Sequence, residues 1–366
     1  MKICTISRPP LKEITKKFGV RRDHILKRMN LMGHEVESFV VHPVHLPNMY
    51  LAYGLGIAIS PFRFPRRRPE LLLADDLESG MAAALIKSVF KIPFVFDFID
   101  DYSLIASYEG RMVRYHALRL LERTIPKLAD GVIAETPKIR EFCLDLGIPE
   151  QRLKVVPNGV DTKQFRPAID DNVMRRKLNL KDNRVILFLG KINKYYNLEV
   201  ILRAVPFVLK SFPDTKFLFV GDGDYLDHLK RLSHELKAEA AVMFTGFVAP
   251  DDIPKIINLS DICVFPLPDD GALAIFEYMA CAKPVVLPRG GTKKMGISRT
   301  IIPDDCALAV DGSPEEFAQG INSLLNNEER AQEMGSKARE RVVAFHDWDR
   351  LAKAYERTLQ KVLPSS

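Results

Sequence analysis

The sequence has little cysteine and no long run of apolar residues. Its five cysteines are scattered over 366 residues with no C-x-x-C pair, whereas disulfide scaffolds and zinc centres usually show regular or paired spacing. The longest apolar-leaning stretch, 46–61, contains proline and glycine and is shorter than the roughly 20 residues of a membrane span. Residues 1–7 are too short for a signal peptide. We therefore expect a cytoplasmic protein without disulfides, structural zinc or a spanning helix.

Low-complexity segments and short repeats are also absent, while hydrophobic residues make up 47% of the chain, enough for large cores. Short apolar runs alternate with helix-like segments, which favours an α/β class with buried parallel sheets. The first series of expected strands is 2–6, 35–41, 71–74, 94–98, 131–134 and 153–156, and the second is 184–189, 216–220, 242–245, 262–265 and 284–287.

A proline-rich and asparagine-rich break at 157–180 separates the two series of strands. The length of the chain also favours two domains. We expect two doubly wound domains, 1–160 and 161–347, that face a cleft and bind ligands at the carboxyl ends of their strands.

Positive charge is concentrated at the start of the chain. Residues 1–68 hold 13 basic and 4 acidic residues, a net charge of +9, while the whole chain carries +6. The stretch 62–68 interleaves two aromatic residues with four arginines, and a putative first helix carries Arg21, Arg22, Lys27 and Arg28. Such a segment suits an anionic membrane surface or nucleic acid; the alternative is an ordinary solvated surface.

Two carboxylates eight residues apart, Asp269 and Glu277, are the most informative feature. Asp269 ends a loop after an apolar strand, and Glu277 lies in a helix-forming run. The N-terminus of a helix attracts anions such as phosphate. A carboxylate placed there must hold something other than phosphate, and the hydroxyl groups of a nucleotide-sugar fit that description. The alternative is that Glu277 only compensates the helix dipole.

Other glycines and charges follow the strands of the second series. Gly190 and Lys191 follow the first strand, where a lysine can neutralise a diphosphate; an exposed loop lysine is the alternative. Gly221 lies in a G-x-G turn, where Asp222 or Asp224 can instead cap the next helix. Gly246 and Phe247 follow a third strand, where backbone groups can contact a base edge.

In the first half, Asp97, Asp100 and Asp101 end a strand. Clustered acids are costly to ionise, so a functional role is one interpretation; two exposed acids and a helix cap are the other. Gly19, ahead of the first helix, permits close approach of a ligand. No further His or acid is spaced to complete a metal site.

Taken in order, these motifs resemble the retaining glycosyltransferases of family 4, which have the GT-B fold of two Rossmann-like domains. The spacing of Asp269 and Glu277 is similar to the family's E-x7-E element, and EYMACAKPVV to its continuation. The segments VVPNGVDTKQFRP, LFLGKI, VGDGD and FTGFV, and the Phe345–Trp348 pair, follow in the expected places. The resemblance implies that the last helix, 348–363, returns to the first domain.

The resemblance also implies roles for individual residues. Glu277 would bind the ribose, Lys191 the diphosphate, and Asp269 the sugar hydroxyls. The backbone of Gly271, Ala272 and Leu273 would cradle phosphate, with Gly19 facing the diphosphate from the first domain. Asp100 or Asp101 would act near the acceptor.

Several positions depart from the family pattern. The first Glu of E-x7-E is Asp269, a second lysine is replaced by Tyr196 unless Lys194 substitutes, a histidine by Ile99, and a glycine by Ala282.

The resulting hypothesis is a retaining, metal-independent hexosyltransferase without a cofactor. It would use a nucleoside-diphosphate sugar and a sugar, lipid-linked or phosphorylated acceptor, with a peripheral contact to an anionic membrane and no nucleic acid. A catalytically degenerate binding or scaffolding subunit and a sugar-nucleotide epimerase are the alternatives.

Overall fold

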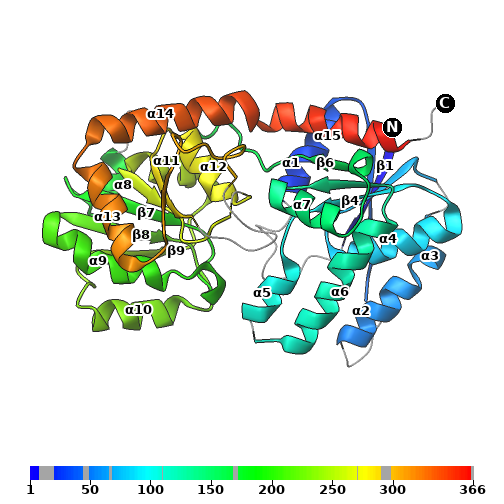
Figure 1. The fold of residues 1–366 in the computed structure, drawn as a ribbon, viewed down its shortest axis with the longest axis horizontal. Helices are drawn as coiled ribbons and strands as arrows, with labels where there is room; N and C mark the ends of the chain where they lie inside the picture. Colours follow the sequence, from blue (N-terminus) through cyan, green and yellow to red (C-terminus); the bar gives the residue numbers. More distant parts are fainter. Residues whose placement is uncertain are drawn as a thin grey trace. The chain divides into compact units, whose positions relative to one another are not determined.

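The computed structural model describes residues 1–7, 20–43, 49–65, 68–108, 110–167, 172–269, 271–289 and 298–363. The chain divides into two compact units (Figure 1). The first unit is Met1–Asn158 with Trp348–Ser366, and the second is Gly159–Asp347. Among the described helices, none combines the length and apolar character needed to cross a membrane.

The first unit contains a six-stranded parallel sheet in the order β2-β1-β3-β4-β5-β6. Its strands are β1 (Lys2–Ser7), β2 (Glu35–Val40), β3 (Leu71–Ala74), β4 (Phe94–Phe98), β5 (Gly131–Ala134) and β6 (Leu153–Val155). The strands β3, β4 and β5 are buried along their whole length, as expected of a parallel sheet covered on both faces. Strand order reverses beside β1, which places the topological switch point between β1 and β3.

Helices cover both faces of this sheet. On one face α1 (Val20–Leu31) packs against the C-terminal helix α15 (Trp348–Val362), and on the other α4 (Leu77–Phe90) packs against α6 (Met112–Leu128) (Figure 1). The remaining helices of the unit are α2 (Met49–Ala58), α3 (Ser60–Arg63), α5 (Tyr102–Tyr108), α7 (Pro137–Asp145) and the 3₁₀ turn η1 (Glu150–Arg152).

The sequence of α15 explains why the last helix packs on the first unit. Its buried residues recur at helical spacing and form one apolar stripe: Trp348, Leu351, Ala352, Tyr355, Thr358 and Leu359. The indole of Trp348 stacks on the His24 ring of α1 with centroids 5.1 Å apart. The helix that the resemblance assigns to the first domain is therefore part of its core.

The second unit contains another six-stranded parallel sheet, in the order β12-β11-β10-β7-β8-β9. Its strands are β7 (Arg184–Leu189), β8 (Thr215–Val220), β9 (Val242–Gly246), β10 (Ile262–Val264), β11 (Val285–Pro288) and β12 (Leu308–Val310). Strand order reverses between β7 and β10, so this sheet has its switch point there.

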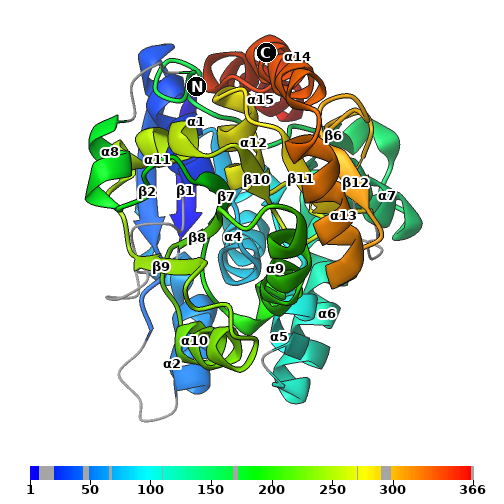
Figure 2. The same cartoon turned by 90° about the vertical axis from the view of Figure 1, so that its left-hand side faces the viewer.

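Two helical layers enclose the second sheet (Figure 2). In one layer α9 (Glu199–Ser211) packs against α10 (Leu226–Glu235) and α13 (Pro314–Leu325). In the other α12 (Leu273–Ala280) packs against α11 (Ile253–Leu259) and α14 (Glu328–Phe345). Shorter elements are α8 (Asn172–Lys177), η2 (Lys194–Tyr196) and η3 (Pro250–Asp252).

The predicted α/β class with two doubly wound parallel sheets is confirmed. The sequence did not predict the helix α2, whose apolar sequence contains Gly54 and Gly56. One of them has a packing reason: a Cβ on Gly56 would lie 2.4 Å from the carbonyl oxygen of His42. The edge strand β12 has only three residues and leaves little pattern to detect.

Candidate functional site

The carboxyl ends of β7, β8, β9 and β10 lie at one edge of the second sheet, because all its strands are parallel. Ligands of doubly wound sheets bind at this edge, beside the switch point. The switch point lies between β7, followed by Gly190 and Lys191, and β10, followed by Asp269. The structure thus brings to one edge of the sheet the residues that the sequence predicts for the donor.

Three glycines join the loops of this edge through the backbone. The amide of Gly190 donates to the Val220 carbonyl at 3.0 Å, and the amide of Gly221 donates to the Gly246 carbonyl at 3.0 Å. Gly221 has φ +138°, and a Cβ there would lie 1.8 Å from the Gly190 oxygen. No other residue fits such a position without moving the backbone. The predicted glycines therefore let two loops approach closely.

The two lysines of the β7 loop point away from the packed interior. Lys191 and Lys194 are both exposed, and neither forms a side-chain hydrogen bond or ion pair with a described residue. The turn η2 that carries Lys194 is fixed by Asn193, whose side chain accepts a hydrogen bond from the Tyr196 amide at 3.2 Å. A charge in this setting is available to a ligand.

Tyr196, which replaces a lysine of the family pattern, has a packing role. Its ring lies edge-on to the rings of Phe188 and Phe265, with centroids 6.1 and 5.8 Å apart. These two residues belong to β7 and to the chain just after β10. The aromatic ring therefore contributes to the packing beneath the switch point.

The loop after β10 leads into α12 without a capping side chain. Asp269 is half-buried, and its Oδ1 accepts a hydrogen bond from the Gly271 amide at 3.0 Å. Burial raises the pKa of Asp269, and the Gly271 amide opposes the shift. No described side chain caps the helix at Ala272, before Leu273. The amides of Gly271 and Ala272 donate to Asp269 itself, whereas the first turn of a helix without a cap leaves N–H groups for an anion.

Glu277 lies half-buried on α12, and its neighbour Tyr278 fixes the helix to β7. The Tyr278 hydroxyl accepts a hydrogen bond from the Leu189 amide at 2.6 Å. Burial raises the pKa of Tyr278 well above its usual value, so this hydroxyl stays neutral. The contact ties the helix that carries Glu277 to the strand that leads to Lys191, and sequence reasoning missed it.

One smaller expectation has a clear outcome. The capping alternative for Asp222 and Asp224 is wrong, because α10 begins after Tyr225 with no side-chain cap; Asp222 instead accepts from the Gly223 amide at 2.8 Å. Phe247 is 57% exposed, so its ring is accessible at the end of β9.

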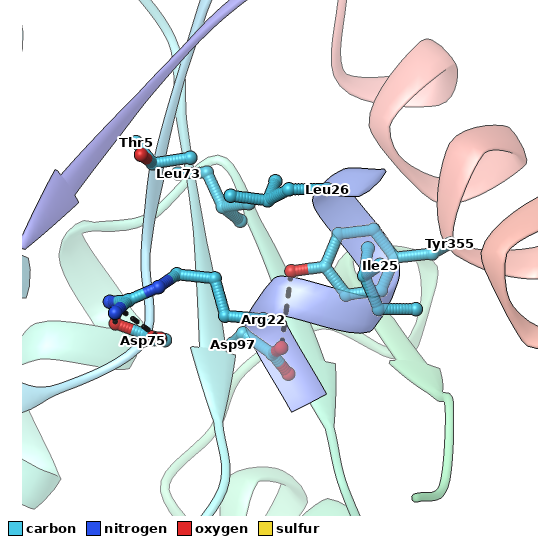
Figure 3. A pocket seen from close by; sticks show the side chains of 8 residues that line it. All are labelled: Thr5, Arg22, Ile25, Leu26, Leu73, Asp75, Asp97 and Tyr355. Carbon is cyan, nitrogen blue, oxygen red and sulfur yellow. Dashed lines mark hydrogen bonds and ion pairs between the residues drawn. The ribbon is translucent and has the colours of Figure 1, made fainter. Parts of the chain in front are cut away.

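The edge of the first sheet is built from paired charges. Arg21 is buried, and its Nε and Nη2 donate to the two carboxylate oxygens of Asp97 at 3.0 and 3.1 Å. The Tyr355 hydroxyl of α15 donates to the same carboxylate at 3.1 Å (Figure 3). Burial alone would lower the pKa of Arg21, but Asp97 holds it above its usual value. Asp97, which the sequence places in a cluster of acids with either a functional role or two exposed members and one helix cap, is thus an internal ion-pair partner.

The other acids of that cluster differ from Asp97. Asp101 is buried and caps α5, accepting from the Leu104 amide at 2.9 Å and the Ser103 hydroxyl at 3.1 Å. Asp100 is half-buried in the loop between β4 and α5. Gly19 lies outside the described residues. The alternative interpretation of the sequence, in which one acid of the cluster caps a helix, is therefore correct for Asp101.

A second ion pair, which the sequence did not predict, lies at the switch point of the first sheet. Arg22 on α1 contacts Asp75, which directly follows β3, at 3.2 Å (Figure 3). Burial raises the pKa of Asp75 to about 7, although Arg22 opposes the shift. The sequence held a signal for this site, because Asp75 directly follows the fully apolar strand β3. Asp97 lies in a similar place, one residue before the end of β4. Within the described ranges, no group of three or more His, Cys, Asp or Glu residues could hold a metal ion.

Comparison with known proteins identifies the family. The family model described as glycosyl transferases group 1 matches residues 170–341, and the glycosyl transferase 4-like domain matches residues 19–159. A GDP-mannose-dependent alpha-(1-6)-phosphatidylinositol monomannoside mannosyltransferase of Mycobacterium tuberculosis is 28% identical over 264 residues. That alignment covers 68% of this chain and 67% of the relative, so the chain spans about two thirds of its length.

Solved structures show the same fold. HepE of Anabaena, in complex with UDP and glucose, has a TM-score of 0.78 at 19% identity, over 98% of this chain and 99% of that one. The sucrose-phosphate synthase of Thermosynechococcus elongatus has a TM-score of 0.83 at 17% identity, over 99% of each chain. With both family models and the observed pair of doubly wound sheets, the chain belongs to the glycosyltransferases of family 4, which have the GT-B fold.

Proposed function

We propose that this glycosyltransferase moves a sugar from a nucleoside-diphosphate sugar to a hydroxyl group of its acceptor, with retention and without a metal or cofactor. The observation that carries the proposal is the edge of the second sheet. There, exposed lysines, close-packed glycine loops and an uncapped helix start lie beside one switch point.

The diphosphate leaving group is the chemical difficulty, because negative charge develops on it as its bond to the sugar breaks. Lys191 and the first amides of α12 supply positive charge where this happens. Lys194, on the fixed turn η2, is the second cation in this scheme, since Tyr196 is occupied by packing. Cations of the protein then neutralise the diphosphate.

The remaining residues of the edge divide the rest of the donor between them. Glu277 accepts hydrogen bonds from the ribose hydroxyls, and Gly246 and Phe247 lie along the base. Asp269 contacts the hydroxyls of the transferred sugar. Its carboxylate oxygens accept hydrogen bonds from these hydroxyls.

The first unit is the acceptor side of the proposal, with Asp100 or Asp101 as the carboxylate near the reacting hydroxyl. The mycobacterial relative is named for a phosphatidylinositol mannoside, which favours a lipid-linked acceptor. Phe62 is 89% exposed beside exposed Arg63 and Arg68; Arg66 and Arg67 lie outside the described residues. We propose that this part of the first unit contacts an anionic membrane at its cytoplasmic face.

A thermal-shift screen with UDP, GDP and ADP tests the donor assignment. One diphosphate is expected to raise the melting temperature by mass action, and Glu277→Ala should remove most of that shift while the variant still folds. Transfer from the matching nucleotide-sugar should be lost in the same variant. Nucleotide binding without any transfer by the unmodified protein would favour a binding subunit, and no binding of any diphosphate would reject the donor site.

A further inference from the structure

Two adjacent arginines begin α1, and they use their donors very differently. Arg21 donates from all five N–H groups, to Asp97 twice, to the Val156 and Pro157 carbonyls and to the Asn158 side chain. Its neighbour Arg22 bonds only through Nη1, which reaches both carboxylate oxygens of Asp75 at 3.2 Å. The Nε and Nη2 groups of Arg22 donate to no described residue.

The Arg22–Asp75 pair is partly exposed among the described residues. The Arg22 side chain is 28% exposed and that of Asp75 14%, so neither is sealed in the core as Arg21 is. Beside the pair lies a cavity of about 10 Å³, enough for one water molecule. Figure 3 shows the Arg22 guanidinium directed toward Asp75, on the strand side of the cavity and away from Tyr355.

The position of the pair is that of a ligand site. Asp75 follows β3 and Arg22 follows the connection from β1, so the two residues flank the switch point of the first sheet. Three N–H groups in a planar fork match the oxygens of a phosphate or sulfate. The Asp75 carboxyl beside them can accept from a hydroxyl group.

We propose that Arg22 and Asp75 form an acceptor subsite that recognises a phosphate group next to sugar or polyol hydroxyls. Arg22 binds the phosphate oxygens through Nε and Nη2, and Asp75 contacts the neighbouring hydroxyl. This inference rests on the proposed function, because it concerns the acceptor of the same transferase, and it narrows the acceptor to phosphate-bearing compounds.

Asp75 also sets the pH dependence of the subsite. A carboxylate so close to a bound oxyanion repels it, while a protonated Asp75 does not. Its pKa of about 7 places this change near neutrality. The groups that face Asp75 are Arg22, Asp97 and Tyr355, with Asp76 next to it in the chain and Tyr102 hydrogen-bonded to its carbonyl. Binding of an anion whose own charge stays constant, such as sulfate, should therefore tighten as the pH falls from 8 to 6.

Calorimetric titration of the full-length protein with sn-glycerol 3-phosphate tests the subsite, with glycerol as the neutral control. Saturable binding of the phosphate alone is expected, and Arg22→Gln should weaken it by about tenfold or more. Lys27→Gln on the same helix is the matched control, since it removes the same charge from an exposed position. Equal weakening by both variants, or no saturable binding, would overturn the proposal.

Two further variants separate binding from stability. Asp75→Asn should tighten binding of sulfate, whose charge is constant over this range, and should abolish the pH dependence. The double variant Arg22→Gln with Asp75→Asn leaves no unpaired buried charge, so it should fold like the parent and still fail to bind. Binding retained in that double variant would show that Arg22 is only a structural partner of Asp75.

A competition experiment distinguishes a lipid headgroup from a soluble compound as the source of the phosphate. Vesicles of phosphatidylglycerol that compete with glycerol phosphate, where phosphatidylcholine vesicles do not, would assign the subsite to a lipid headgroup. Competition by neither would assign it to a soluble phosphate. The thermal-shift screen with nucleoside diphosphates is independent of the glycerol phosphate titration. If the unmodified protein binds a nucleoside diphosphate but not glycerol phosphate, the acceptor subsite is rejected and the proposed donor site is not.

Discussion

The two sheets have the same design and treat charge at their ligand edges in opposite ways. In the second unit the cations after β7 are exposed and have no partner among the described side chains, while the loops are held by backbone contacts between glycines. In the first unit the cations after β1 are paired with carboxylates that follow or belong to neighbouring strands. A sheet edge with unpaired lysines suits a highly charged ligand. A sheet edge built from ion pairs discriminates between ligands, because each ligand must compete with the carboxylates for the arginines.

The largest effect should come from breaking the buried pair of the first unit. Arg21→Met leaves Asp97 buried without its cation, which typically costs 3–5 kcal/mol of unfolding free energy. Chemical denaturation measures the loss. Lys27→Met, exposed on the same helix, should change stability by less than about 0.5 kcal/mol. A similar small change in Arg21→Met would show that Asp97 finds another partner.

The second unit should respond in activity rather than in stability. Lys191→Met removes charge that acts on the leaving diphosphate, and kcat/KM should fall by about 10²-fold or more. The melting temperature should stay constant, because the exposed Lys191 side chain has no described partner. Lys230→Met on α10, also exposed, is the matched control. Equal rates for both variants would remove Lys191 from the donor site.

The predicted membrane contact should show a smaller effect. Co-sedimentation with anionic vesicles at low salt should weaken by roughly fivefold to tenfold in the double variant Phe62→Ser with Arg63→Ser, since a basic residue near such a surface contributes about 1 kcal/mol. The matched pair Leu31→Ser with Lys27→Ser changes an apolar and a basic residue that are also exposed, on α1, and should bind as the parent does. If the unmodified protein stays in the supernatant, the membrane proposal is wrong.

The smallest effect concerns the backbone behind the donor site. Ala282 has φ +56°, in the left-handed region that glycine adopts without strain. Ala282→Gly should therefore raise the unfolding free energy by about 0.5–1 kcal/mol, because relief of strain exceeds the added freedom of the unfolded chain. Transfer activity should not change. Destabilisation would indicate that the Ala282 methyl group packs more favourably than its backbone conformation costs.

Sequence reasoning located the strands because parallel strands are apolar throughout and end in turns. The segments 71–74, 94–98, 131–134 and 184–189 were predicted with the observed bounds. The glycines at the ends of β7, β8 and β9 could be placed at one edge for the same reason, since parallel strands share the direction of their ends. What the pattern could not show is that Gly221 approaches Gly190 itself.

The first unit was predicted less well because its site depends on pairs distant in sequence. Arg21 and Asp97 are 76 positions apart, and Tyr355 is 258 positions from Asp97. A count of charges assigns Arg21, Arg22 and Arg28 to a basic surface. The structure instead pairs them with Asp97, Asp75 and Asp349. The basic surface of α1 is therefore smaller than the net charge of +9 suggests.

The place of α15 in the first unit has a consequence for synthesis. The ribosome makes the second unit, Gly159–Asp347, as one uninterrupted segment, and such units can fold as they emerge. Residues 1–158 of the first unit are made before this segment yet wait for α15 to follow it, because Trp348 and Tyr355 complete the core and the Asp97 network of that unit. The unit whose translation begins first is thus the last to be completed. In a chain that stops at residue 347, the second unit would be complete, whereas the first unit would lack α15 and expose the apolar face that this helix covers.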